Sequence, residues 1–349
     1  MSVVSLARPE IRNLRVYETA VPTNGAIRLH ANESSWTWDR ESEPMNRYPE
    51  LRPGKLQARL AERFGVSNEN LLVTRGSSEA IDLLIRSFCR AGEDDIVIAP
   101  PTFVMYKAFA DIQGAKTRKC PLLAVDDFAL DGDRLLNICS ANSKLIFLCS
   151  PNNPTGNIVT RSDIVRLLEA RTDQSIVVVD EAYIEFSDAE SAAGLIDKYD
   201  NLVVLRTLSK ALALAGARCG AVIGSPVIIR MLNAVLAPYA LSTPVIDCVL
   251  HALSSDNATT SQVRIGATIQ ERQRLAETLA AVRSVQKLWP SQANFLLVQF
   301  RDLQEVQERL RAERILIRDL SANPGFDNFA RITIGSAEEN GRLLSALSE

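Results

Sequence analysis

Short, continuous apolar runs alternate with amphipathic stretches over the first two-thirds of the chain. Such runs are typical of strands that helices cover on both faces. Helical spacing of apolar residues follows the first run at 77–86, which begins with two serines able to cap a helix. Strands that alternate with helices predict a mostly parallel sheet. The expected strands lie at 71–74, 95–99, 145–149, 176–179, 202–205 and 221–224.

The pattern changes after about Pro244. A long amphipathic helix is expected over 260–282, followed by strand-like runs at 294–298, 315–318 and 331–335 and a terminal helix. This order predicts a smaller α+β domain. The first 25 or so residues show little periodicity and predict an extended arm. We therefore expect an arm at 1–27, a large α/β domain at 28–245 and a small C-terminal domain at 246–349, which suits a chain of 349 residues.

Composition excludes several classes of protein. With 46% hydrophobic and 23% charged residues the chain is ordinary globular material, and a net charge of −3 favours neither nucleic acid nor a membrane surface as a partner. No apolar run approaches ~18 residues and no signal-peptide pattern opens the chain, so a cytoplasmic protein is expected. The six cysteines form no CxxC pair, and only two histidines are present. We therefore expect reduced thiols, no metal site and no serine–histidine triad.

Polar residues with complementary chemistry follow three of the expected strands. Asn153 lies in the loop after the run at 145–149, Asp180 and Tyr183 follow the run at 176–179, and Lys210 follows the run at 202–205. Open α/β sheets bind their ligands at the carboxyl ends of strands. An amide, a carboxylate, a phenol and an amine converging there describe a pyridoxal phosphate (PLP) site. Such a site needs a lysine for a Schiff base and a carboxylate for the pyridinium nitrogen.

Each of these residues also has a purely structural interpretation. Asp180 alone could cap a helix after a strand, and the composition of 150–156 alone predicts a turn. The combination with Tyr183 and Lys210 favours the cofactor. In that interpretation Asp180 keeps the pyridine nitrogen protonated, while Asn153 and Tyr183 donate hydrogen bonds to the 3′-oxygen.

A phosphate group needs backbone N–H groups at a helix start and a cation. The sequence Gly-Ser-Ser at 76–78 opens a helix directly after a strand, which suits an anion but is also ordinary capping. Arg218 lies among small residues at 215–220, where an arginine is hard to explain as a solvated surface charge. The candidate phosphate ligands are Ser77, Ser78, Thr207, Ser209 and Arg218.

Three further side chains are candidates for contact with the cofactor or the substrate. Phe103, after two prolines, could stack on the pyridine ring or belong to the core. Arg331 is a charged residue inside a strand-like run. It could lie on an outward-facing edge, or it could bind a substrate carboxylate through two hydrogen bonds. Arg318 could serve a second anionic group of the substrate.

Six stretches together resemble the fold-type I PLP-dependent aminotransferases, and within them the histidinol-phosphate branch. That branch is indicated most by Arg-Thr-Leu-Ser-Lys-Ala with Leu-Ala-Gly-Ala-Arg-Cys-Gly, preceded by Asp-Glu-Ala-Tyr-Ile-Glu-Phe. The resemblance runs from about residue 30 to residue 335. The stretches are 46–50, 75–86, 150–156, 179–186, 205–220 and 237–245.

The resemblance implies the fold, the reaction and the assembly. The fold would be the PLP-dependent transferase fold type I, with helices on both faces of the central sheet. Histidinol phosphate would exchange its amino group with 2-oxoglutarate, with Lys210 as Schiff base and proton shuttle and Arg331 at the substrate α-carboxylate. The resemblance also implies a homodimer in which Tyr48 reaches the partner's cofactor phosphate. Tyr17 and Asn32 would then contact the substrate.

The chain departs from the family pattern in places, and rival functions stay open. Phe103 stands where some members have tyrosine, Ala330 replaces a leucine before Arg331, and the segment 29–36 differs from the usual Asn-Ala-Asn-Glu-Asn-Pro. The alternatives are an aminotransferase for aromatic amino acids and a phosphothreonine-type decarboxylase on the same fold. A PLP-binding regulator or a cofactor-free interaction domain is the alternative outside enzymes.

Overall fold

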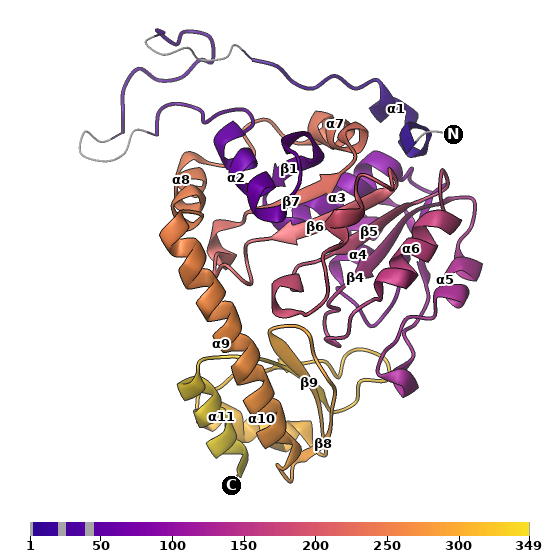
Figure 1. The fold of residues 1–349 in the computed structure, drawn as a ribbon, viewed down its shortest axis with the longest axis vertical. Helices are drawn as coiled ribbons and strands as arrows, with labels where there is room; N and C mark the ends of the chain where they lie inside the picture. The colour runs from indigo at the N-terminus through magenta and orange to yellow at the C-terminus, as the bar shows by residue number, and fades with distance from the viewer. Residues whose placement is uncertain (1–2, 20–25, 39–44, 349) are drawn as a thin grey trace.

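Two sheets organise the chain in the computed structural model, which describes residues 3–19, 26–38 and 45–348. The larger sheet has seven strands, and the smaller one has four (Figure 1). In the large sheet the order is β1 (Leu71–Thr74), β7 (Gly220–Gly224), β6 (Leu202–Thr207), β5 (Ile176–Asp180), β4 (Ser143–Cys149), β2 (Asp95–Ile98) and β3 (Lys116–Lys119).

The large sheet confirms the expected mostly parallel arrangement. Only β7 runs antiparallel to its neighbours β1 and β6 within this sheet. All six strands expected in this part of the sequence are present, and β3 is an addition. Its sequence, Lys-Thr-Arg-Lys, has no apolar pattern because the strand lies at the edge and is largely exposed.

Helices cover both faces of the large sheet, as expected. Alternate residues of β6 belong to different cores: Val203 and Leu205 pack in one, Leu202 and Val204 in the other. This alternation follows from the two-residue period of a strand. The helices of this part are α2 (Gly54–Phe64), α3 (Gly76–Phe88), α4 (Met105–Gln113), α5 (Gly132–Ile138), α6 (Arg161–Ala170), α7 (Pro226–Val235) and α8 (Thr243–Ala252).

The long helix α9 (Ser255–Ala280) leads from the large sheet to the small one (Figure 1). The small sheet is antiparallel, in the order β10 (Arg318–Asp319), β11 (Phe329–Thr333), β9 (Phe295–Phe300) and β8 (Val285–Leu288). Helices α10 (Leu303–Ala312) and α11 (Ala337–Ser348) pack in its core. The strand expected at 315–318 begins later than predicted, because only Arg318 of that run pairs with β11. Strand β8 was not expected from the sequence.

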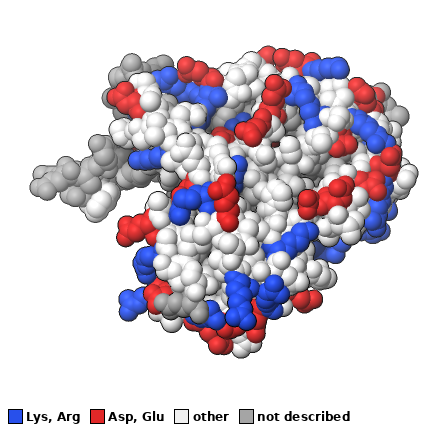
Figure 2. All heavy atoms as spheres, turned by 60° about the horizontal axis from the view of Figure 1, so that its bottom comes forward, with Lys and Arg blue, Asp and Glu red and all other residues white. Residues whose placement is uncertain are grey.

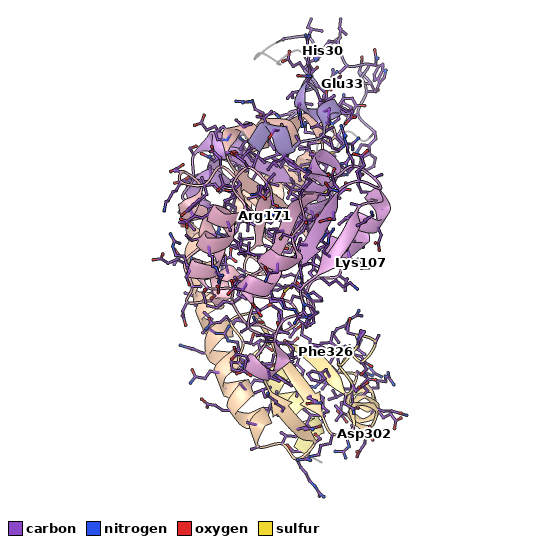
Figure 3. All side chains as sticks on the ribbon, turned by 90° about the vertical axis from the view of Figure 1, so that its right-hand side faces the viewer. His30, Glu33, Lys107, Arg171, Asp302 and Phe326 are labelled. Atoms are coloured by element: carbon purple, nitrogen blue, oxygen red, sulfur yellow. The ribbon has the colours of Figure 1, made fainter. Side chains whose placement is uncertain are left out.

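The N-terminal segment begins on the large domain and then leaves it. Val3 and Leu6 of the short helix η1 (Val3–Leu6) are buried in the large core, and α1 (Pro9–Arg12) follows. The described residues between α1 and α2 are mostly exposed and extend away from the body (Figure 1). Glu33, at the opposite end of the molecule from Asp302 (Figure 3), accepts hydrogen bonds from Arg28 at 2.6 Å and Arg47 at 3.0 Å.

On one face of the molecule, the charged side chains of the described residues do not separate by sign. Figure 2 shows Lys and Arg interspersed with Asp and Glu over one face of the molecule. None of the helices in the described ranges combines the length and the apolar character that a membrane span requires.

Candidate active site

A pocket lies at the carboxyl ends of the central strands of the large sheet. It contains all of the expected cofactor-binding residues except Tyr48, together with Cys149, Ala182 and Ala215. The expected residues that line it are Ser77, Ser78, Phe103, Asn153, Asp180, Tyr183, Thr207, Ser209, Lys210 and Arg218.

The register of the parallel strands brings these residues together. Cys149, the last residue of β4, is opposite Asp180 at the end of β5, and Asp180 is opposite Leu205 of β6. The loop after β4 and the turn after β6 therefore leave the sheet at the same edge. Asn153 and Lys210 lie on these two connections, so both reach the pocket.

Asp180 is a buried carboxylate at the base of the pocket, only 2% exposed. Its Oδ2 accepts a hydrogen bond from the Tyr106 hydroxyl at 2.8 Å, and its Oδ1 accepts one from the Ala182 backbone N–H at 3.2 Å. Burial raises the pKa of Asp180 from its ordinary value of 3.8 to about 6, against the opposing effect of the Tyr106 hydrogen bond. A carboxylate held in this way favours a cationic ligand, because a positive charge offsets the cost of burial.

Lys210 is exposed to the pocket in the turn after β6. Partial burial lowers the pKa of its amine, and the positive charges of Arg331 and Arg218 lower it further, while Asp180 acts in the opposite direction. A lowered pKa increases the share of neutral amine, which is the nucleophilic and proton-accepting form.

The small sheet contributes Arg331 to the edge of this site. Its Nη1 donates a hydrogen bond to Oδ1 of Asn153 at 2.6 Å, and its guanidinium lies 5.3 Å from the ring centroid of Phe295. Tyr183 packs edge-on against the same Phe295 ring, with centroids 5.2 Å apart, and burial raises the pKa of its hydroxyl. Nε of Arg331 is buried without a hydrogen-bond partner among the described residues. Such a donor at a pocket edge suits an anionic ligand.

Hydroxyl and guanidinium groups gather at the start of α3. Nη1 of Arg218 donates to Oγ of Ser209 at 3.3 Å, and the Thr207 hydroxyl donates to the same oxygen at 3.0 Å. Gly76 has φ +77, and a Cβ on it would lie 2.8 Å from Nη2 of Arg218. The absent side chain therefore leaves room for the guanidinium beside the first turn of α3. Free amides, hydroxyls and a guanidinium together form a phosphate-binding arrangement.

Apart from Arg331 at its edge, four expected residues lie outside this pocket of the single chain. Tyr17 and Asn32 are exposed in the segment before α2, and Tyr48 is 49% exposed, with its ring stacked on Tyr239 at 4.5 Å. Arg318 of β10 is exposed and directly opposite Arg331 of β11 in the antiparallel register. Opposite residues on neighbouring strands project from the same face, so the two arginines share one face of the small sheet.

Sequence reasoning missed Tyr106, the direct partner of Asp180. In the sequence, the only indication of Tyr106 is that it comes three residues after Phe103, at the start of an amphipathic helix. A tyrosine in that position is ordinarily interpreted as part of the hydrophobic core. Among the residues that the structure describes, no group of three or more His, Cys, Asp or Glu side chains could hold a metal ion.

Comparison with known proteins identifies the family to which this arrangement belongs. The family model described as aminotransferase class I and II matches residues 13–347. The chain is 41% identical to the histidinol-phosphate aminotransferase of Aeromonas hydrophila, covering 100% of this chain and 98% of that protein. It is 40% identical to the histidinol-phosphate aminotransferase of Salmonella typhi, and the match covers 99% of this chain and 97% of that protein.

A solved structure shows the same fold. The histidinol-phosphate aminotransferase of Sinorhizobium meliloti, in complex with pyridoxal-5′-phosphate, superposes with a TM-score of 0.79 at 23% identity. The match covers 87% of this chain and 82% of that one. The PLP-dependent transferase fold expected from the sequence is confirmed.

Replacing Asp180 by asparagine is expected to stabilise the cofactor-free protein at neutral pH. Because the folded pKa of about 6 lies above the ordinary 3.8, the folded state binds more protons than the unfolded state between these values. Stability of the wild type therefore falls as the pH rises through this window. Asp180→Asn removes this penalty. Above pH 6 the free energy of unfolding of the variant is therefore expected to exceed that of the wild type by on the order of 3 kcal/mol, and below about pH 4 the two are expected to be equal. Urea denaturation at several pH values measures this difference.

The exposed Asp126 offers a control for the loss of one negative charge. Asp126→Asn is expected to leave the pH dependence of stability unchanged. A constant difference between Asp180→Asn and wild type at every pH would contradict the assignment of a raised pKa to Asp180.

Replacing Gly76 by alanine is expected to weaken cofactor binding about 10-fold or more, because the new Cβ displaces the Arg218 guanidinium. The measurement is the dissociation constant of PLP for the cofactor-free protein. Gly65→Ala is the matched control: Gly65 also has positive φ, +66, but nothing lies within 4 Å of its added Cβ. Both variants carry similar backbone strain, so equal affinities would refute the role of Gly76.

Proposed function

The chain belongs to the class I and II aminotransferases, and from that membership we propose that it transfers the amino group of L-histidinol phosphate to 2-oxoglutarate. The products are imidazole acetol phosphate and glutamate, and the reaction is a step of histidine biosynthesis. Support for this substrate comes from the histidinol-phosphate aminotransferases that match the chain over its full length at about 40% identity. The enzyme is an aminotransferase, and its cofactor is pyridoxal 5′-phosphate.

The residues of the pocket fit this cofactor. A buried carboxylate at the base, an exposed lysine amine and a group of phosphate-binding donors are each in reach of one cavity. When bound, pyridoxal phosphate supplies an aldehyde that bonds to amines and a protonated ring that withdraws electrons. The observation that carries the proposal is the buried Asp180 carboxylate, which suits a ring nitrogen that must stay positively charged.

The side chains of the large domain divide the work on the cofactor. Asp180 holds a negative charge at the ring nitrogen in a site that excludes water, so it stabilises the protonated ring electrostatically. Asn153 and Tyr183 donate to the 3′-oxygen, and Phe103 packs on the ring. Ser77, Ser78, Thr207, Ser209 and Arg218 bind the phosphate.

Lys210 moves the proton that transamination requires. Its lowered pKa favours the neutral amine, the form that would bond to the cofactor aldehyde. With its Nζ free, Lys210 would accept the proton from the substrate Cα as a general base and would deliver it as a general acid to the cofactor carbon that carries the aldehyde. The same residue therefore serves as nucleophile and as proton carrier.

Two arginines of the small sheet form the anion subsite in this proposal. Arg331 binds the α-carboxylate of glutamate with bidentate geometry, and its buried Nε without a protein partner supports this role. Arg318 binds the phosphate of histidinol phosphate, supported by its position directly opposite Arg331. Like charges in opposite positions destabilise a sheet, and a bound anion between them offsets that repulsion.

We also propose the assembly and the division of the chain. The protein is a homodimer in which Tyr48 contacts the partner's cofactor phosphate and Tyr17 and Asn32 contact the substrate. Their exposure outside the pocket of their own chain supports this arrangement. The division is an arm at 1–27, a large domain at 28–245 and a small domain at 246–349. The cytoplasmic location expected from the sequence stays a prediction.

Competition between amino donors tests the substrate. Histidinol phosphate is expected to exceed phenylalanine, tyrosine and phosphothreonine in kcat/KM by about 100-fold or more, because only it offers both an imidazole and a phosphate. Amine transfer is followed through formation of glutamate, and release of carbon dioxide is measured in parallel. A preference for phenylalanine or tyrosine would support an aromatic aminotransferase, and carbon dioxide from phosphothreonine would support a decarboxylase.

Mixing two inactive variants tests the shared site. Lys210→Ala is expected to abolish turnover, and Tyr48→Ala to abolish it at limiting PLP. A dimer with one subunit of each kind has one intact site, since Lys210 comes from one chain and Tyr48 from the other. Reassociated mixtures are expected to recover roughly a quarter of wild-type activity, as half of the dimers are such hybrids. Absence of recovery, with hybrid formation verified by mass, would contradict a site built from two subunits.

A further inference from the structure

Tyr106 stands directly behind the cofactor pocket. It lies in the first turn of α4, is 0% exposed, and donates a hydrogen bond from its hydroxyl to Oδ2 of Asp180 at 2.8 Å. Asp180 lies 74 residues further along the chain. The contact therefore joins α4 to the end of β5 at the charged base of the pocket.

Aromatic packing fixes the direction of this hydroxyl. The Tyr106 ring is stacked on Phe147 of β4, with centroids 4.8 Å apart and planes at 14°. On another side it meets the Phe103 ring edge-on at 5.6 Å and 85°. A ring held by two others keeps its orientation, so the phenol donates along one line.

The chemistry of a buried phenol suits a permanent donor. Burial, strengthened by the nearby Asp180 charge, raises the pKa of Tyr106 well above its ordinary value, so the hydroxyl keeps its proton wherever the protein is folded. The other titratable groups that face Asp180 are Cys149, Tyr183 and Lys210. Burial raises the pKa of both Cys149 and Tyr183, which favours their neutral forms, so Lys210 is the one of these groups that can carry a positive charge.

We propose that Tyr106 is a positioning residue of the cofactor site, whose hydroxyl keeps the Asp180 carboxylate ionised and aimed at the ring nitrogen of pyridoxal phosphate. The proposal rests on the role assigned to Asp180 in the proposed function. A carboxylate that accepts one fixed hydrogen bond on Oδ2 and another on Oδ1 cannot rotate without breaking both. The geometry therefore sets the orientation of Asp180 before the cofactor arrives.

The test compares two cofactors on the cofactor-free protein. One is pyridoxal 5′-phosphate, and the other is its 1-deaza analogue, in which C–H replaces the ring nitrogen. Tyr106→Phe keeps the aromatic packing and removes only the hydroxyl. It is expected to weaken binding of pyridoxal phosphate about 10- to 100-fold, the size typical of a hydrogen bond to a charged group. Binding of the deaza analogue is expected to change by less than about threefold or to tighten, because it makes no contact that depends on the charge of Asp180.

Tyr199→Phe is the matched control. The Tyr199 hydroxyl donates to Oε1 of Glu169 at the same distance, 2.8 Å, but at the amino end of β6, away from the pocket. It is expected to leave the affinity for both cofactors within about threefold of wild type. Adding Tyr106→Phe to Asp180→Asn is expected to cause no further loss of pyridoxal phosphate affinity, since the hydroxyl acts through the carboxylate.

The outcomes separate this proposal from the function on which it rests. Equal weakening for both cofactors would show that Tyr106 only supports packing and would overturn the proposal. A wild-type preference for pyridoxal phosphate that Tyr106→Phe leaves unchanged would overturn the role of Tyr106 alone. A wild-type protein that binds both cofactors equally would overturn the role of Asp180 and this proposal with it.

Discussion

A buried carboxylate is the constraint on which the rest of the site depends. Asp180 is almost fully removed from water, and burial alone drives it toward the protonated form. The protein compensates only in part, through hydrogen bonds from Tyr106 and Ala182. In the role that we propose for Asp180, a positive ring nitrogen completes the compensation, so the affinity for the cofactor and the cost of burying the carboxylate have the same origin. The site is therefore built for a ligand that carries its own cation.

Positive charge dominates the rest of the pocket for a complementary reason. Burial lowers the pKa of Lys210, and Arg331 and Arg218 lie close enough to lower it further. We propose that the phosphate of the cofactor and an anionic group of the substrate neutralise the two arginines, which relieves the repulsion among these three groups. The lowered pKa of Lys210 favours its neutral amine, which is the nucleophilic form.

Contacts between the two sheets hold Arg331, the residue that we propose binds the substrate carboxylate. Arg331 of the small sheet hydrogen-bonds to Asn153 of the large domain, and the Gln292 backbone N–H donates to the Gly156 carbonyl at 2.8 Å. Gly156 has φ +81, and any Cβ there would lie 2.4 Å from Oγ of Ser291. A glycine at this position lets the loop after β4 and the small domain meet closely. One loop thus carries Asn153, a proposed cofactor ligand, and supports Arg331, a proposed substrate ligand.

The sequence by itself determined the parallel sheet, the strand ends and the presence there of Asn153, Asp180, Tyr183 and Lys210, which line one pocket and which we propose as site residues. These follow from apolar runs and from polar residues just beyond them, both encoded within a few neighbouring residues. Only the tertiary structure decided the contact of Tyr106 with Asp180 and that of Arg331 with Asn153, which join residues 74 and 178 positions apart. It also decided the strand β3, whose charged residues pair only because a neighbouring strand offers an edge. Local patterns specify elements, whereas the rotation and approach of distant elements depend on how the whole core packs.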